Sequence, residues 1–199
     1  MYLIMPRPYS MDKRIAKVQQ VRNQIVEAAL AVHAERGILG TKPADVAARA
    51  NVALTTYYKH FPSLGALVRA CTTRGRELVS PPDPSILRTP SQAPAGRVAT
   101  MVRTLFDYYE AREPWLYAGR TEERFVPELQ PVLAAQRVAR DAFVRATLAE
   151  TGIGRETVAV ATALVDFWTW RTMRRDGGLT QEEVINAVTT TIQRAASPR

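Results

Sequence analysis

Cysteine and histidine are scarce in this sequence of 199 residues: Cys71 is the one cysteine, and His33 and His60 are the two histidines. A single cysteine excludes an intramolecular disulfide and a metal site built from clustered cysteines. The sequence also lacks a glycine-rich phosphate loop, and its acid pairs, 122–123 and 182–183, have no histidine or lysine at catalytic spacing. We therefore expect no enzyme activity, no metal and no cofactor.

Long hydrophobic runs are missing as well. No segment approaches the ~20 apolar residues that span a bilayer. The apolar run at residues 1–5 is shorter than the roughly 7–15 residues of a signal-peptide core. We expect a cytoplasmic protein with no membrane partner. Met5 and Met11 leave open which methionine is the natural start.

Acidic residues are few in the N-terminal third of the chain. Residues 1–62 contain nine lysines and arginines against four acids, whereas the rest of the chain contains 18 against 15. The formal net charge of +8 is therefore concentrated in the first third. Concentrated positive charge attracts a polyanion, so this balance favours nucleic acid as a partner, although a merely solvated surface has a similar composition.

Glycine and proline divide the chain into segments with helical periodicity. Apolar residues recur at i, i+3, i+4 and i+7 within these segments, and none shows the alternation of a strand. The fold class is therefore all-α. Thr41 is expected to cap the second helix and Ser63 the fourth, Pro114 to end the fifth and Pro131 to interrupt the seventh. Asn51 tolerates the left-handed backbone that a tight turn after the second helix needs. The predicted helices are 13–36, 43–50, 53–61, 63–79, 97–112, 115–125, 128–150, 155–175 and 180–196.

The second and third predicted helices are joined by about three residues around Asn51, as in a helix-turn-helix. In that motif the second helix enters the major groove of DNA, while the first crosses the backbone. Helical spacing turns Ala53, Tyr57 and Phe61 inward. The opposite face has hydroxyl and cationic groups but no acid, and it contains Leu54, Thr55, Tyr58 and Lys59.

Four short motifs sharpen this interpretation: AALAVHAERG at 28–37, Thr41, DVA at 45–47 and ANVALTTYYKHFPSLGAL at 50–67. With them, residues 22–68 resemble the N-terminal domain of the TetR family of bacterial repressors. The resemblance implies a helical C-terminal domain that binds a small effector and forms a homodimer. It also implies a palindromic double-stranded DNA operator, with half-sites ~34–36 Å apart.

The resemblance assigns Thr56, Tyr58 and His60 to DNA contact, and Thr41 to the start of the second helix at the DNA backbone. Side-chain chemistry adds Lys42 and Lys59 as phosphate contacts and Thr55 as a contact to thymine methyl groups. The predicted DNA-binding residues are thus Thr41, Lys42, Thr55, Thr56, Tyr58, Lys59 and His60.

Three positions depart from the family pattern. Thr55 replaces a glycine, Leu64 replaces a lysine that contacts phosphate, and Ala44 replaces an arginine. The third helix also has no arginine, asparagine or glutamine that could bind a base through two hydrogen bonds. Sequence specificity is therefore expected to rest on threonine and apolar contacts, together with the basic N-terminal arm.

These observations predict four parts of the chain. Residues 1–18 are the basic arm, and 19–79 are the DNA-binding domain, whose helix-turn-helix covers about 42–61. Residues 80–96 form a linker that contains five prolines, and 97–199 bind the effector and form the dimer. The effector is expected to be apolar or aromatic, because the predicted pocket residues are Phe106, Tyr109, Trp115, Tyr117, Phe125, Phe143 and Trp168. The predicted dimer interface consists of Ala161, Leu164, Val165, Trp168, Ile185, Val188 and Ile192.

The most favoured function is a repressor that an effector releases from its operator. A TetR-like activator or a regulator without a ligand has the same features and remains open. A second alternative is a helical protein–protein interaction module with a degenerate DNA-binding head, because of the three departures. Absence of DNA binding at low salt would exclude the regulators and favour the interaction module.

Overall fold

The computed structural model of the protein describes residues 11–83, 85, 94–149 and 154–196. Over these residues the fold is all-α, as predicted: it contains nine α-helices and no strand. The chain divides into two compact units, Met1–Arg74 and Gly75–Arg199, and the division falls within the fourth helix. None of the helices in the described ranges is long and apolar enough to cross a membrane.

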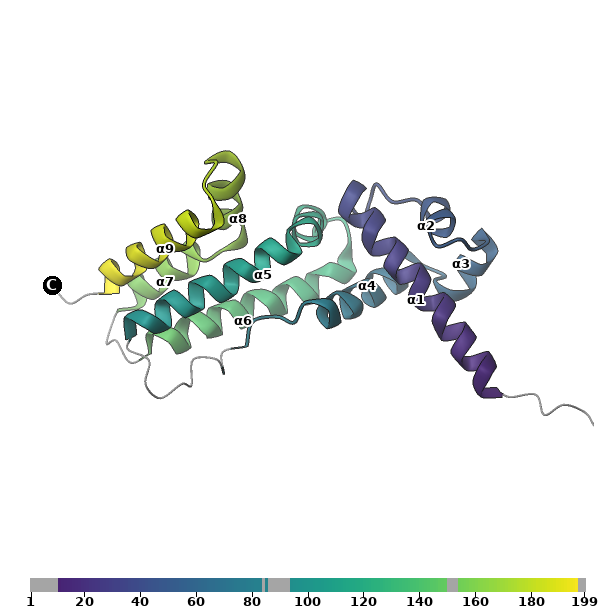
Figure 1. Cartoon of the computed structure of the whole chain (residues 1–199), viewed down its shortest axis with the longest axis horizontal. Coiled ribbons are helices and arrows are strands. Elements are labelled where there is room, and N and C mark those ends of the chain that lie inside the picture. The colour runs from purple at the N-terminus through teal and green to yellow at the C-terminus, as the bar shows by residue number, and fades with distance from the viewer. Residues whose placement is uncertain (1–10, 84, 86–93, 150–153, 197–199) are drawn as a thin grey trace, which may run out of the picture. The chain divides into compact units, whose positions relative to one another are not determined.

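The first unit contains α1 (Met11–Arg36), α2 (Pro43–Arg49), α3 (Leu54–His60) and the first part of α4 (Leu64–Leu78) (Figure 1). On α1, apolar residues at helical spacing form its buried face, because Ile25, Ala29 and Val32 are at most 3% exposed. Gly37 ends α1 with a φ of 77°, and its N–H donates to the His33 carbonyl at 2.9 Å. A left-handed glycine at this place is a common helix C-terminus.

Two predictions about helix ends in this unit are confirmed and two are wrong. Asn51 has the predicted left-handed backbone in the turn between α2 and α3, with a φ of 53°. Ser63 caps α4, because its Oγ accepts from the Ala66 N–H at 3.2 Å. Thr41 does not cap α2, since the N-cap is Lys42, without a side-chain hydrogen bond. Ala53 is the exposed N-cap of α3 instead of an inward residue.

The second unit is built on four helices: α5 (Pro94–Glu122), α6 (Gln130–Leu148), α7 (Arg155–Leu164) and α9 (Gln181–Ala196). In this arrangement α5 contacts α6 and α9, and α7 contacts the same two helices (Figure 1). A 3-10 turn, η2 (Pro127–Leu129), precedes α6, and α8 (Phe167–Arg171) with a π-helical turn, η3 (Thr172–Asp176), lies between α7 and α9. The core of this unit is rich in aromatic side chains, with Phe106, Phe143, Phe167 and Trp170 all at most 1% exposed.

The helix that was predicted to end at Pro114 continues through it to Glu122. A proline inside a helix costs about 3 kcal/mol or more. Here buried side chains on both sides of the proline, Tyr109 and Leu116, hold the helix in the core. Pro131 lies in the first turn of α6, where a missing N–H is tolerated, so it starts this helix rather than interrupting it.

The predicted helix 155–175 is interrupted at Val165 and Asp166, so this segment contains more than one helix. Asp166 has an extended backbone, and its Oδ1 accepts from the Trp168 N–H at 2.9 Å, which makes it the N-cap of α8. A side chain that caps a new helix therefore stops α7, although the apolar spacing continues past it. The linker predicted for residues 80–96 lies mostly outside the described residues, and its last three residues begin α5.

Candidate DNA-binding surface and ligand cavity

Helix α3 depends on two buried aromatic side chains. It has seven residues, fewer than the ~12–15 that make an isolated helix even marginally stable in water. Tyr57 and Phe61 are 3% and 1% exposed, and their ring centroids are 6.3 Å apart. The guanidinium of Arg22 on α1 lies 5.1 Å from the Phe61 ring centroid, in a cation–π contact. Burial of these two rings therefore sets the position and rotation of α3.

The opposite face of α3 is open to solvent. Tyr58 is 49% exposed, and its ring packs edge-on against Tyr57 at 5.3 Å. The predicted division of the two tyrosines, one buried and one exposed, is confirmed. Thr55 and Lys59 are exposed, and Thr56 and His60 are partly exposed. The structure thus places five of the seven predicted DNA-binding residues on one short helix.

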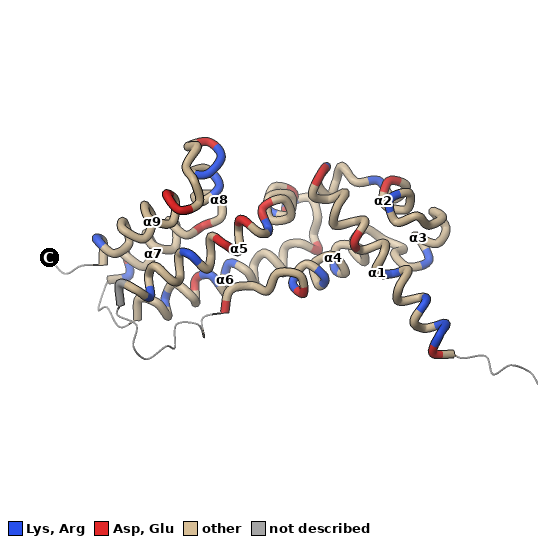
Figure 2. Tube along the Cα trace, in the orientation of Figure 1, with Lys and Arg blue, Asp and Glu red and all other residues tan. Residues whose placement is uncertain are grey.

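Three acids of the first unit pair with arginines, and among the described residues this leaves lysines near α3 without an acid partner. Three arginines of the first unit are paired with acids: Arg36 with Asp45 at 3.1 Å, Arg49 with Glu35 at 2.5 Å and Arg74 with Glu27 at 2.5 Å. Figure 2 shows that α3 itself carries no acid. Within the described part of the chain, Lys42 and Lys59 have no acid partner. Both lysines are therefore available to an external anion.

Thr41 stabilises the loop between α1 and α2 instead of capping a helix. Its hydroxyl donates to the Gly37 carbonyl at 2.6 Å and lies 3.0 Å from Nδ1 of His33. Because the one hydroxyl proton goes to Gly37, Thr41 accepts from the Nδ1–H of His33, a hydrogen bond that the neutral and the protonated ring can both make. The other ring nitrogen is Nε2. That Nε2 is buried without a partner among the described residues. Burial lowers the pKa of His33, which the contact with Gly37 only partly opposes.

Acidification is expected to destabilise the first unit through His33. A histidine whose pKa is lower in the folded state stabilises the fold above its unfolded pKa of about 6.5, and this contribution is lost progressively as pH falls below that value towards the lower folded-state pKa. The free energy of unfolding in urea should therefore fall as the pH drops below about 6.5, with a slope of up to about 1.4 kcal/mol per pH unit. In His33→Gln the slope should flatten, and an unchanged slope in that variant would contradict the assignment.

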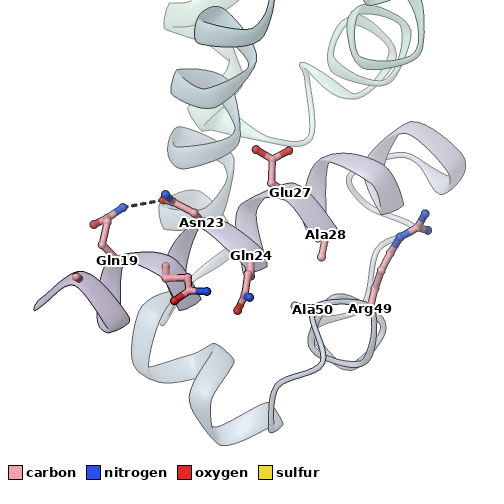
Figure 3. Close-up of a pocket in the computed structure, with 9 residues that line it drawn as sticks. Gln19, Asn23, Gln24, Glu27, Ala28, Arg49 and Ala50 are labelled. Carbon is pink, nitrogen blue, oxygen red and sulfur yellow. Dashed lines mark hydrogen bonds between the residues drawn. The ribbon is translucent and has the colours of Figure 1, made fainter. Parts of the chain in front are cut away.

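An open groove lies beside α1, with a volume of about 880 Å³. Figure 3 shows Gln19, Asn23, Gln24 and Glu27 of α1 along it, and Arg49 with Ala50 at its other side. Gln19 donates to Asn23 Oδ1 at 2.7 Å. Amide side chains contact both phosphates and base edges, so this row adds polar groups that the motif comparison did not identify. The sequence already showed that these polar residues recur along one predicted helix.

The second unit contains a small cavity of about 40 Å³. Two of the predicted effector residues, Tyr109 and Phe143, line it together with Leu105. Its polar wall was not predicted and contains Tyr108, Arg120, Gln136 and Arg140. Arginine and glutamine on apolar-rich helices carry no local signal, so only the packing of α5 on α6 brings them together.

The other predicted effector residues are dispersed. Phe106 is buried in the core, and Trp115 is partly exposed with Arg112 5.1 Å from its ring centroid. Phe125 is 56% exposed on the surface. Tyr117 and Trp168 are each 41% exposed and pack edge-on at 5.9 Å. The structure therefore does not gather the seven residues around one cavity.

Most of the apolar residues predicted for the dimer interface are buried. Ala161, Val165, Ile185, Val188 and Ile192 are at most 3% exposed, within the core of the chain itself. Of the other two residues, Leu164 is partly buried against this core and Trp168 is exposed. Helical periodicity identified the apolar faces of these helices correctly. Those faces are buried within the four-helix arrangement of a single chain.

Comparison with known proteins supports the resemblance of the first unit. Residues 25–71 match the sequence model of the family described as "Bacterial regulatory proteins, tetR family". No curated protein matches the sequence.

Solved structures resemble the whole fold. The TetR family transcriptional regulator PfmR from Thermus thermophilus is 21% identical, with a TM-score of 0.65 over 87% of this chain and 99% of its own. A protein from Rhodococcus sp. ascribed to the TetR family is 22% identical, with a TM-score of 0.62 over 89% and 100%. The multidrug binding protein EbrR, complexed with imidazole, is 21% identical, with a TM-score of 0.58 over 98% and 95%.

At these identities the structural likeness shows the fold, and the matched sequence of residues 25–71 shows the domain. The predicted resemblance is therefore confirmed: the chain carries the helix-turn-helix DNA-binding domain of the TetR family of bacterial regulatory proteins and has the fold of that family.

Proposed function

We propose that this protein is a transcriptional repressor that binds a palindromic operator as a homodimer and is released by a small molecule. The observation that carries this proposal is the exposed face of α3, which combines Thr55, Tyr58 and Lys59 with no acid. Hydroxyl and ammonium groups hold phosphates and fix the register of a protein on DNA. Thr56 and His60 extend the same surface, and Lys42 adds a cation at the start of α2.

A homodimer is needed because a palindrome presents two equivalent half-sites. The exposed faces of α7 and α9 suit such an interface, since they have small or uncharged side chains at their centres. These are Ala159, Val160 and Ala163 on α7, and Ala187, Thr190 and Thr191 on α9. Short side chains allow helix axes to approach to the lower end of about 8–10 Å. This face replaces the buried rows that the sequence predicted for the interface.

The ligand response is assigned to the cavity of the second unit. Pro81 and Pro82, which follow the end of α4, form part of its wall. Because α4 is one continuous helix that begins in the DNA-binding unit, a ligand that moves these prolines also acts on α4. Binding then favours a state with a different spacing of the two α3 helices, and DNA is released.

Lys59→Gln is expected to weaken binding to every DNA sequence by a similar factor, because a phosphate contact has no sequence preference. It should also reduce the slope of log K against log salt by about 0.9 per DNA-binding unit. The measurement is a mobility-shift titration against the upstream region of the gene, at several salt concentrations. Arg145→Gln, on the exposed face of α6, removes the same charge from the other unit and should leave the slope unchanged.

A loss confined to one operator position in Lys59→Gln would refute its role on phosphate. Failure of the unmodified protein to bind DNA at low salt would favour the protein–protein interaction module. Binding that raises transcription would identify an activator, and binding that no small molecule changes would identify a regulator without a ligand.

A further inference from the structure

The cavity in the second unit has a strongly polar wall for its size. Its volume of about 40 Å³ is roughly the space of one to three water molecules. Two guanidinium groups line it, from Arg120 on α5 and Arg140 on α6, and none of its lining residues in the described ranges is acidic. The side chains of these arginines are only 9% and 13% exposed. A cavity with two buried cations is unusual for an apolar ligand.

Arg120 is the less well satisfied of the two. Its Nη1 is 3.5 Å from Asp166 Oδ2, which is longer than a good hydrogen bond. Its Nε is buried without a hydrogen-bond partner among the described residues. The guanidinium stacks at 5.2 Å from the Phe167 ring centroid. A buried cation normally has a close anion with good geometry, because its desolvation is costly.

Asp166 is shared among several donors. Its Oδ2 accepts from Arg140 and faces Arg120, while its Oδ1 accepts from the Trp168 N–H at the start of α8. Arg140 has a second partner in Asp141 at 2.8 Å. One carboxylate therefore interacts with two guanidiniums and a helix N-terminus, and its contact with Arg120 is the weakest of the three.

Two further polar groups belong to the cavity. Gln136 Oε1 is buried and has no partner in the described part of the chain. Burial raises the pKa of Tyr108, so its phenol stays protonated near neutral pH and can donate a hydrogen bond. The other wall is apolar, with Leu105, Tyr109 and Phe143. Arg120 and Tyr108 thus offer hydrogen-bond donors to an anion at one end of the site, where Gln136 Oε1 can only accept, and the other end accepts an apolar body.

We propose that this cavity binds the carboxylate of a small organic acid, with Arg120 as its principal partner and Arg140 beside it. The apolar part of the acid lies against Leu105, Tyr109 and Phe143. Because the present volume holds little more than the carboxylate, the rest of the acid displaces Pro81 and Pro82. The role of this acid as the effector rests on the proposed function, whereas its binding does not. This proposal adds a carboxylate to the apolar or aromatic effector that the sequence predicts.

The test compares matched acids and amides on the full chain by isothermal titration calorimetry without DNA. The probes are hexanoate against hexanamide, and phenylacetate against phenylacetamide. We expect the acids to bind about tenfold more tightly or better at neutral pH, since a hydrogen bond to a charged group adds more than a neutral one. In Arg120→Met the preference for the acids should disappear. In Arg145→Met, an exposed arginine of α6, it should persist.

Equal binding of acids and amides to the unmodified protein would overturn the proposal, and so would a failure of both acids to bind. A preference that survives in a folded Arg120→Met variant would overturn it too. If that variant does not fold, the acid–amide comparison on the unmodified protein decides the matter alone. Operator release by the same acids is measured separately by mobility shift, so that an acid that binds without releasing DNA rejects the effector role but keeps the site.

Discussion

Replacement of Phe61 by alanine is expected to lower the free energy of unfolding by about 3–5 kcal/mol and to abolish operator binding at the same time. Phe61 is 1% exposed, so the loss includes its transfer free energy and the cavity left behind. The change also removes the ring that packs near Tyr57 and beneath Arg22. Without it, α3 has one buried aromatic residue left, and seven residues do not hold a helix by themselves.

The measurement is urea unfolding followed by circular dichroism, together with a mobility shift of the same sample. Leu64→Ala is the matched control, because Leu64 follows closely in the chain but is 40% exposed. Its stability should change by less than about 1 kcal/mol. A Phe61→Ala variant that still binds DNA with unchanged affinity would show that burial of this ring does not position α3.

Alanine at Gly75 is expected to destabilise the protein by about 2–4 kcal/mol, although alanine is the better helix former by about 1 kcal/mol. A Cβ at Gly75 would lie 2.5 Å from Nη2 and 2.9 Å from Nη1 of Arg112. Arg112 is 8% exposed, donates to the Gly75 carbonyl and has a buried Nε without a partner among the described residues. The methyl group would push a buried guanidinium away from its acceptor, and this cost exceeds the gain in helix propensity.

Gly119→Ala supplies the opposite sign as a control. It lies inside α5, and a Cβ there meets no atom within 4 Å. We therefore expect a gain of about 0.5–1 kcal/mol from helix propensity. Both variants are measured by thermal unfolding, and stabilisation by Gly75→Ala would show that Arg112 moves without cost. Since Gly75 lies on α4, its variant should also alter the ligand response of DNA binding.

Local periodicity was sufficient for the candidate DNA-binding surface. The spacing of Tyr57 and Phe61 predicted which side of α3 is buried, and the structure confirms it. The prediction succeeded because one turn of helix fixes the direction of each side chain, whatever lies beyond it. The left-handed Asn51 and the Ser63 cap also follow from the nature of single residues.

Local patterns failed where packing competed with them. Pro114 was expected to end a helix, but buried residues on both sides carry the helix through it. The apolar spacing of 155–175 predicted one helix, but Asp166 caps a second one. For Pro114 the outcome depends on core contacts with residues far away in the chain, whereas Asp166 acts locally through a cap that apolar spacing does not reveal.

The all-α fold class, the family of the first unit and the exposed face of α3 could be predicted from the sequence, because each depends on residues within a few turns of one another. Which apolar faces remain open depends on how the helices pack: Val165 and Ile185 lie in the core of one chain, while Ala163 and Ala187 remain exposed. Helix packing also determines the chemistry of the cavity. Arg120, Gln136 and Arg140 lie on two helices, and only the packing of α5 on α6 buries these polar side chains together, where the desolvation of the two guanidiniums favours the proposed acid.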